Sequence, residues 1–158
     1  MSTTAAGWCP VGTSKNICLR ENVYLSNLAL WNVKLHNLHW NVTGRTFVQI
    51  HEFTEKLYDE VFEQFDAVAE IQKMQNNMPL VKMSDYLQQA TLSEIEAKDF
   101  TPDEVLKIVD ADMKTMAALA KEIRDEAAEK DDFAVANMFE DYLASYSKNL
   151  WFLRAMLK

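Results

Sequence analysis

Hydrophobic side chains recur every three or four residues along four long segments of the chain. The first segment runs from about residue 22 to 41, the second from 46 to 74, the third from Thr101 to Ala127, and the fourth follows Asp131-Asp132. This spacing places apolar side chains on one face of an α-helix, so the pattern predicts four amphipathic helices. The predicted core positions are Leu25, Leu28, Trp31, Leu35, Leu38, Val42, Phe47, Ile50, Phe53, Leu57, Val61, Phe65, Val68, Ile71, Val105, Val109, Met113, Met116, Ala120, Ile123, Ala127, Val135, Phe139, Tyr142, Tyr146, Leu150, Leu153 and Leu157.

The residues between the predicted helices indicate how the helices are connected. Thr43-Gly44 ends the first helix, and the short connection that follows makes the first two helices an antiparallel hairpin. Before the third helix, Thr101-Pro102-Asp103-Glu104 combines an N-cap, a proline at the first helical position and a glutamate at the capping-box position. Asp131-Asp132 then ends the third helix and caps the start of the fourth.

Residues 75–100 join the second and third helices, and the length of this connection decides the topology. A structureless loop of this length is uncommon in a compact domain, so we expect a short extra helix at about Tyr86–Ala97. A helix of about 28 residues is about 40 Å long, and the connection can run back along that length. The second and third helices then lie parallel. The sequence predicts an all-α fold, the ferritin-like four-helix bundle with one long crossover that carries a short extra helix.

Composition agrees with a single all-α domain. The chain has 158 residues but only 3 glycines and 3 prolines, too few for the many turns of a β-sandwich or barrel. We expect one bundle domain over residues 21–158. Residues 1–20 carry only two charges, Lys15 and Arg20, and show no helical period, so we expect them to form a flexible N-terminal tail.

The charge, the cysteines and the absence of targeting segments indicate which compartment and which partners to expect. The N-terminal residues lack the basic and apolar segments of a secretory signal, and no stretch reaches the roughly 20 apolar residues of a membrane span. The net charge of −8 disfavours nucleic acid as a default partner, because phosphate binding depends on Lys and Arg. Cys9 and Cys18 do not make a disulfide framework, so we expect unpaired thiols in a reducing cytoplasm.

All three histidines, His36, His39 and His51, fall within one short segment, which suggests a metal site. His39 lies about one turn before the end of the first helix and His51 about one turn into the second, so the hairpin lets both face one region. A histidine near a helix end is more often a surface or capping residue, and that alternative stays open for each. No histidine has an acidic residue three positions before it, which excludes the Glu-x-x-His motif of a di-iron centre inside one bundle.

Asp66 and Glu70 lie on one face of the second predicted helix, at positions i and i+4. Both stand beside core positions, so each would need a cationic or metallic partner, although two solvated carboxylates is the alternative. His51 and Asp66 are separated by about 22 Å of helical rise, so they cannot bind one metal within one chain. A site that contains both must combine two chains, as in a two-fold dimer of antiparallel helices.

The residues around these candidates resemble the signature of the Dps family, the mini-ferritins of the ferritin-like superfamily. The matching residues are Leu38, His39, Trp40, Asn41, Val42, Thr43, Gly44, Phe47, Ile50, His51, Phe53, Tyr58, Asp66, Ala69 and Glu70. The length of the crossover and the segment Leu150-Trp151-Phe152-Leu153 extend the resemblance over about residues 20–158.

The resemblance implies an iron centre shared between two subunits. His39 and His51 would come from one subunit, and Asp66 and Glu70 would come from its two-fold mate. Glu55, one turn after His51, would assist a second and weaker iron. Imidazole and carboxylate groups together bind Fe(II), and carboxylates stabilise Fe(III) after oxidation.

Two tryptophans and the aspartate pair before the fourth helix are given roles outside the iron ligands. Trp40 resembles a family tryptophan that supplies an electron near the iron centre, and core packing is the compatible structural interpretation. Trp151 is predicted to be a core residue. Asp131 and Asp132 fit loosely the acidic pore through which iron enters relatives, with helix capping as the alternative.

The resemblance also implies the function. The chain would be a ferroxidase that oxidises Fe(II), with H2O2 as the preferred acceptor or with O2, and stores Fe(III) mineral in a hollow homo-dodecamer that protects DNA from oxidative damage. Twelve chains would carry a formal charge of about −100, which attracts Fe(II). Two alternatives stay open, a nucleoid-condensing DNA-binding shell and a metal-binding shell without catalysis. Because the tail carries so few cations, we expect DNA binding to be weak or absent.

Overall fold

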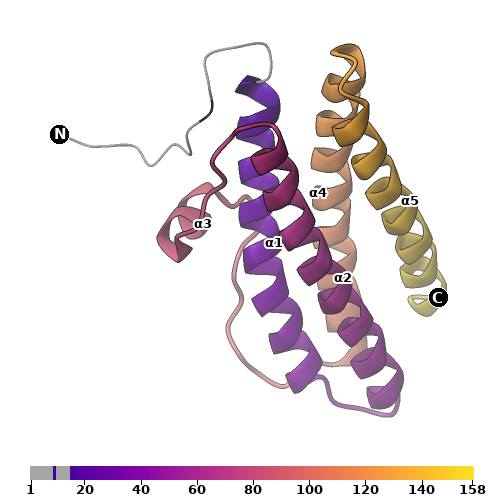
Figure 1. Cartoon of the computed structure of the whole chain (residues 1–158). Coiled ribbons are helices and arrows are strands. Elements are labelled where there is room, and N and C mark those ends of the chain that lie inside the picture. Colours follow the sequence, from indigo (N-terminus) through magenta and orange to yellow (C-terminus); the bar gives the residue numbers. More distant parts are fainter. Residues whose placement is uncertain (1–8, 10–14) are drawn as a thin grey trace.

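The computed structural model describes residue 9 and residues 15–158, and the remaining residues at the N-terminal end lie outside the described part. The described chain forms five helices, α1 (Lys15–Asn41), α2 (Phe47–Met74), α3 (Met83–Gln89), α4 (Pro102–Glu129) and α5 (Phe133–Met156). The four long helices stand side by side, and the short α3 packs outside them against α1 (Figure 1). The predicted all-α bundle with a short extra helix is confirmed. Within the described residues, no helix is long and apolar enough to cross a membrane.

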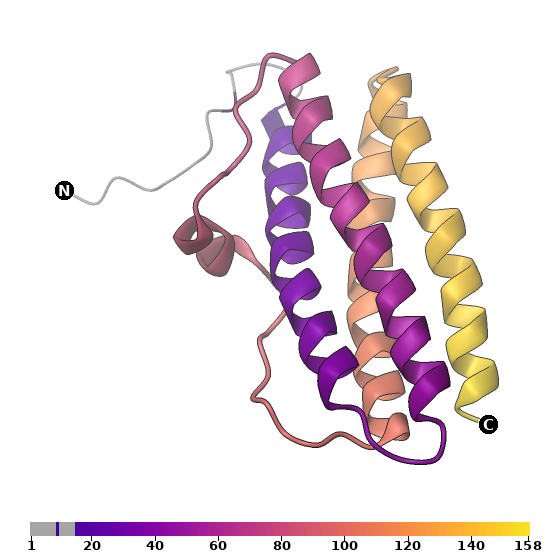
Figure 2. The same ribbon diagram turned by 60° about the horizontal axis from the view of Figure 1, so that its bottom comes forward.

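The helices are arranged as two antiparallel hairpins, α1 with α2 and α4 with α5, joined by the crossover (Figure 2). The end of the crossover is held beside the α1–α2 turn. The Phe100 N–H donates to the Asn41 carbonyl at 2.9 Å, and the Thr43 N–H donates to the Phe100 carbonyl at 2.9 Å. The crossover has therefore run the length of the bundle, and α2 and α4 are parallel as predicted.

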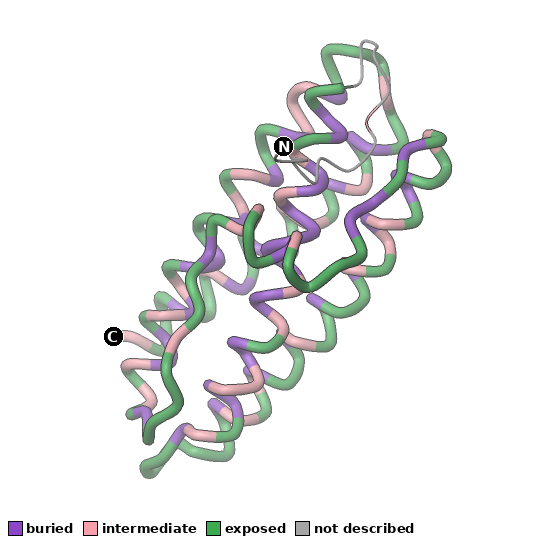
Figure 3. Tube along the Cα trace, turned by 90° about the vertical axis from the view of Figure 1, so that its left-hand side faces the viewer, coloured by how far each residue is buried: buried purple, intermediate pink, exposed green. Residues whose placement is uncertain are grey.

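The core follows the predicted hydrophobic stripes, most completely on α1 and α4, where every predicted position is buried. Figure 3 shows buried positions repeating along the inner side of the long helices. Two aromatic predictions are wrong, because Phe47 is 38% exposed and Trp151 is 59% exposed. Trp151 lies away from the stripe of α5, whose buried residues include Phe139, Tyr146 and Leu153.

A buried ion pair joins the two hairpins. Lys34 on α1 lies 2.8 Å from Asp112 on α4, and both residues are largely buried. Burial raises the pKa of Asp112, and the hydrogen bond from Lys34 opposes that rise. Removal of one partner alone would leave an uncompensated buried charge, so the pair specifies how α1 and α4 meet.

The predicted capping box at the start of α4 is confirmed. The Glu104 N–H donates to the Thr101 hydroxyl at 3.3 Å, and the Thr101 N–H donates to the Glu104 carboxylate at 2.8 Å. A hydrogen bond from Lys98, followed by those from Thr101, lowers the pKa of Glu104 to about 2. The N–H groups of Thr101 and Glu104 have no carbonyl partner within α4, so the capping box satisfies them and fixes where the crossover ends and α4 begins.

Replacing Thr101 by alanine is expected to lower the free energy of unfolding by about 1 kcal/mol, because the Glu104 N–H loses its acceptor. Chemical denaturation at a fixed protein concentration measures the change. Thr101→Ser is the matched control, since it keeps the hydroxyl and should remain close to the unchanged chain. Equal midpoints for Thr101→Ala and Thr101→Ser would contradict a role for the cap in stability.

The extra helix lies earlier in the crossover than predicted, at Met83–Gln89 rather than Tyr86–Ala97. A side chain on α1 explains where it stops. The Asn27 amide oxygen accepts hydrogen bonds from the N–H groups of Thr91 at 2.7 Å and Leu92 at 3.1 Å. These donors are used in a tertiary contact, so the helix does not continue through residues 90–97.

The start of the chain departs from the prediction in two ways. Helix α1 begins at Lys15, so residues 15–20 are helical and not part of a tail; the other tail residues except Cys9 lie outside the described part. Cys9 and Cys18 form a disulfide with a Cα–Cα distance of 6.0 Å, so the prediction of unpaired thiols is wrong. No pattern in the sequence predicts that these two cysteines pair. Their pairing also removes the argument from cysteine usage for a reducing compartment.

The turn between α4 and α5 uses both predicted aspartates. Asp131 adopts a left-handed conformation with φ of 56°. Asp132 is the N-cap of α5, where its carboxylate accepts from the Val135 N–H at 3.3 Å and from the Gln75 amide at 2.6 Å. These contacts agree with the capping interpretation, and a pore role for either residue stays a prediction.

Candidate metal centre

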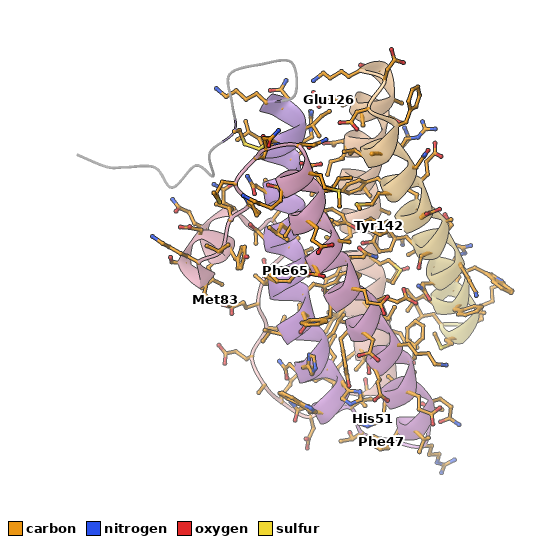
Figure 4. The ribbon with its side chains drawn as sticks, viewed as in Figure 1. Phe47, His51, Phe65, Met83, Glu126 and Tyr142 are labelled. Atoms are coloured by element: carbon orange, nitrogen blue, oxygen red, sulfur yellow. A yellow bond between two sulfur atoms is a disulfide. The ribbon has the colours of Figure 1, made fainter. Side chains whose placement is uncertain are left out.

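The α1–α2 hairpin brings His39 and His51 together at its closed end. The two imidazole rings are stacked, with centroids 3.5 Å apart and planes 18° from parallel. Gly44 lets the chain reverse here, because its φ of 121° lies in a region that side-chain-bearing residues avoid. A Cβ at Gly44 would also lie 3.3 Å from the Pro102 ring. The turn therefore places histidines from two helices side by side. Figure 4 shows His51 at this end of the bundle, close to Phe47.

Each histidine is oriented by the backbone of the other. His39 Nδ1 lies 2.8 Å from the His51 carbonyl, and His51 Nδ1 lies 2.9 Å from the His39 carbonyl. A carbonyl oxygen only accepts, so both Nδ1 atoms carry the proton. Neutral imidazole then has its lone pair at Nε2, which is the atom left to bind a metal ion.

The local environment favours the neutral form of His39. Desolvation lowers the pKa of His39, and the hydrogen bond to the His51 carbonyl partly opposes this effect. The Thr54 hydroxyl lies 3.2 Å from His39 Nδ1 and is itself bonded to helix carbonyls, which fixes the ring further. His39 is therefore prepared to bind a cation near neutral pH without first releasing a proton.

Aromatic side chains surround the pair. Tyr58 meets His39 edge-on at 5.2 Å and stacks on His36 at 3.9 Å. His36 Nδ1 is bonded to a carbonyl on its own helix, and the ring lies 5.4 Å from Trp40. Trp40 is 68% exposed, so it is not packed in the core of the single chain. Sequence reasoning did not identify Thr54, whose contribution depends on backbone partners that no motif encodes.

The predicted carboxylates lie further along α2. Glu55, Asp66 and Glu70 are all exposed, and neither Asp66 nor Glu70 has a hydrogen bond or ion pair within the part of the chain that the structure describes. The expectation that Asp66 and Glu70 need a partner because they stand beside core positions is therefore wrong for one chain. Exposed carboxylates are satisfied by solvent.

The four α2 candidates nevertheless share one face. At 100° per residue, His51, Glu55, Asp66 and Glu70 fall within an arc of about 100° around the helix. Along the axis, His51 and Asp66 are about 22 Å apart. Over the described residues, no group of three or more His, Cys, Asp and Glu side chains lies close enough to hold a metal ion. One chain therefore presents two half-sites, a histidine half and a carboxylate half, on the same side of α2.

An apolar surface lies between the two half-sites. Phe62 on α2, Val33 on α1 and Met83 on α3 are 66%, 59% and 61% exposed, and they border a shallow groove of about 190 Å³. Figure 4 shows Phe65 on α2 and Met83 on α3 at this level of the bundle. Phe62 stands outside the core stripe of α2, a signal that the sequence contained. We call Val33, Phe62 and Met83 the apolar patch.

The fold and the paired histidines on a helical hairpin define a class of protein. The family model for the ferritin-like domain matches residues 22–158, so the protein is a ferritin-like four-helix bundle. The DNA protection during starvation protein of Brevibacillus brevis is 33% identical over 137 residues, which cover 87% of this chain and 91% of that protein. The corresponding Helicobacter pylori protein is 30% identical over 125 residues, covering 79% of this chain and 87% of that one.

Solved structures agree with the sequence relatives. Antigen TpF1 from Treponema pallidum has a TM-score of 0.91 and 29% identity, with 98% of this chain and 99% of that chain covered. A Dps protein from Bacillus brevis has a TM-score of 0.89 and 30% identity, with 95% and 100% covered. The chain belongs to the Dps family.

Proposed function

We propose that this protein is an iron-storage and detoxification mini-ferritin. It oxidises Fe(II) with H2O2, or with O2, at centres shared between two-fold related subunits, and it stores the ferric product inside a hollow dodecamer. By consuming iron and peroxide together, it protects DNA from oxidative damage.

The spacing of charged groups on α2 carries this proposal. His51 and Glu70 are placed symmetrically about the middle of the helix, and Glu55 and Asp66 are placed symmetrically about the same point. When two copies of α2 run antiparallel across a two-fold axis at that point, His51 faces Glu70 of the mate and Glu55 faces Asp66 of the mate. Phe62 then lies next to the axis. The dimer then has two complete sites, and each combines the histidine half-site of one chain with the carboxylate half-site of the other.

The apolar patch supports the same pairing. Clustered exposed apolar side chains are rare on isolated proteins unless another surface covers them. The patch lies between the half-sites and includes Phe62, which with Asp59 lies closest to the proposed axis on this face of α2. Burying it against a second copy would remove apolar area from water at the place where the antiparallel helices cross.

The chemistry suits the proposed ligands. His39 and His51 offer Nε2 atoms, and Asp66 and Glu70 of the mate offer carboxylates, a mixed set that binds the borderline ion Fe(II) and tolerates the harder Fe(III). Glu55 assists a second, weaker iron. Two Fe(II) ions give one electron each and peroxide accepts both. With two water molecules the products are two ferric oxyhydroxide units and four protons.

Trp40 is proposed as an auxiliary electron donor. Its ring is exposed and lies 5.4 Å from His36, on the same turn of α1 as the ligand His39. An indole at this position can supply an electron when a peroxide reaction finds only one Fe(II), which limits the escape of hydroxyl radical. Its exposure in one chain agrees with a position at the interface between subunits.

The charge of the chain supports iron as cargo more than DNA as partner. A net charge of −8 per chain attracts cations and repels phosphate. We therefore propose that protection of DNA comes from removing iron and peroxide, with DNA binding weak or absent.

The test is an anaerobic oxidation experiment on the metal-free protein. The protein is loaded with Fe(II), H2O2 is added, and ferric absorbance in the near ultraviolet is followed against a protein-free control. We expect faster oxidation than in the control, a soluble brown protein and no trapped hydroxyl radical. Oxidation no faster than the control, with precipitating ferric hydroxide, would contradict the ferroxidase proposal and favour a shell without catalysis.

A further inference from the structure

A second polar cluster lies at the opposite end of the bundle from the histidine pair. Glu21 on α1, Gln72 on α2 and Asn77 just beyond α2 are each at most 1% exposed. Within the described residues, both side-chain polar atoms of each residue lack a hydrogen-bond partner, as does Oε1 of Gln75. Unpaired buried polar atoms are costly, and native proteins normally pair them with ordered water or a bound ion. We call these four residues the buried amide cluster.

The helix register brings Glu21 and Gln72 to the same end of the bundle. The Tyr24 hydroxyl on α1 donates to the Gln64 amide oxygen on α2 at 2.7 Å. Glu21 lies one turn before Tyr24 and Gln72 lies two turns after Gln64. Because the helices are antiparallel, both steps lead to the same end, and Glu21 and Gln72 are within about two turns of each other. The Asn77 N–H donates to the Gln72 carbonyl at 2.9 Å, which folds the end of α2 back onto this level.

The start of α5 also lies at this end of the bundle. The Gln75 amide donates to the Asp132 carboxylate at 2.6 Å, which ties the N-cap of α5 to the end of α2. Asp132 also acts on Glu21. Burial, followed by the negative charge of Asp132, raises the pKa of Glu21 to about 8.

Positive charges at this end of the bundle pair with other carboxylates. Among the described residues, neither Glu21 nor Asp132 forms an ion pair. Arg20, the sequence neighbour of Glu21, is engaged by Glu122 and Glu126 of α4 instead. Figure 4 shows Glu126 at this end of the bundle and His51 at the other. The buried Glu21 and the half-buried Asp132 therefore have no cation partner among the described residues, at an end of the bundle that also presents amide oxygens.

We propose that the buried amide cluster, with Glu21 as its charged ligand and Asp132 beside it, binds one hard divalent cation of the Ca²⁺ class. Its donors are carboxylate and amide oxygens, the ligands that Ca²⁺ takes in flexible coordination, and it contains no imidazole or thiolate. The two carboxylates balance the charge of one divalent ion. Mg²⁺ demands a stricter octahedral arrangement and sheds water reluctantly, so we expect it to bind more weakly.

This site is separate from the proposed iron centre. Glu21 and His39 are separated by about 27 Å along α1. The ion would join the start of α1, the end of α2 and the start of α5. It would therefore stabilise the folded chain without taking part in oxidation.

The test is a calorimetric titration of CaCl2 into the full-length protein after removal of metals with a chelator. It is performed in an Asp66→Asn/Glu70→Gln background, so that these exposed carboxylates do not contribute. We expect one Ca²⁺ per chain. Glu21→Gln in that background is expected to weaken the affinity by at least about tenfold, because the charged ligand is lost while the shape is kept. Glu129→Gln, which removes an exposed carboxylate at the same end, should leave the affinity unchanged.

Asn77→Ala provides a second variant, since it removes an amide ligand without changing charge and is expected to weaken binding as well. Circular dichroism and gel filtration check that each variant is folded and assembled. In thermal unfolding, Ca²⁺ should raise the midpoint of the background protein more than that of Glu21→Gln. Absence of saturable binding near one ion per chain would overturn the proposal and leave ordered water as the occupant. Equal affinity in Glu21→Gln and Glu129→Gln would overturn it too.

Discussion

Changing Asp66 to asparagine and Glu70 to glutamine in the same chain is expected to slow peroxide-dependent oxidation of Fe(II) at least about 100-fold. Loss of a residue that merely orients a metal ligand already costs 10–100-fold, and this variant removes both carboxylate ligands themselves. Both side chains are exposed and have no partner within the described chain, so the amides should be tolerated and the shell should assemble. Stopped-flow absorbance in the near ultraviolet measures the rate, and gel filtration measures the assembly.

A matched control is available in Glu94→Gln with Glu129→Gln. Both glutamates are exposed and lie away from α2, so this variant loses the same charge and should oxidise iron at the rate of the unchanged protein. Similar slowing in both double variants would mean that overall charge, rather than ligation, controls the rate. A failure of Asp66→Asn/Glu70→Gln to assemble would assign the pair a structural role.

Mixing two inactive variants tests whether the site is shared. A His51→Gln chain keeps its carboxylate half-site, and an Asp66→Asn/Glu70→Gln chain keeps its histidine half-site. In a mixed two-fold dimer one of the two centres is intact, so random co-assembly should restore about a quarter of the centres. Iron oxidation after co-expression measures the restoration. A site contained in one chain would give no restored activity at any mixing ratio.

The second large effect is expected from Glu21. Its pKa is about 8 in the folded chain and 4.5 in the absence of structure, so between these values the folded state holds a proton that the unfolded state has released. Stability therefore falls as pH rises from about 4.5 to 8. A shift of this size corresponds to roughly 5 kcal/mol for the metal-free protein. The cause is the burial of a carboxylate that has Asp132 nearby and no cation beside it.

Glu21→Gln isolates this contribution, because glutamine keeps the shape of the neutral acid and does not ionise. In the presence of a chelator, the two proteins should have similar free energies of unfolding near pH 5. The variant should become more stable than the unchanged protein by several kcal/mol near pH 8.5. Denaturant midpoints at one protein concentration measure the difference. A difference that stays constant over this pH range would show that Glu21 titrates normally in the folded chain.

The sequence predicts the bundle well because long helices leave a strong periodic signal. The stripes on α1 and α4 were identified residue by residue, and the capping box at Thr101 located the start of α4. The failures occurred where a local pattern competes with a tertiary contact. Asn27 ends α3 earlier than propensity suggests, and Cys9 forms a disulfide with Cys18.

One property of the candidate metal centre also follows from the sequence, whereas another required the structure. The spacing of histidines and carboxylates along α2 shows from sequence alone that His51 and Asp66 of one chain cannot bind the same metal ion, because helical rise separates them. The reciprocal bonds between the His39 and His51 rings and carbonyls, which leave both Nε2 atoms available, depend on how two helices meet. No residue pattern encodes a backbone carbonyl as a partner, so this feature required the structure.

The sequence by itself determined the all-α bundle, its parallel crossover and the wide separation of His51 from Asp66, since each follows from periodicity, length and rise along a helix. Only the tertiary structure decided which polar groups are solvated and which are enclosed. Asp66 and Glu70 stand beside core positions yet face water, whereas Glu21 is fully buried without a partner. Burial depends on neighbours from other helices, and their approach is a property of the packed bundle rather than of any one segment.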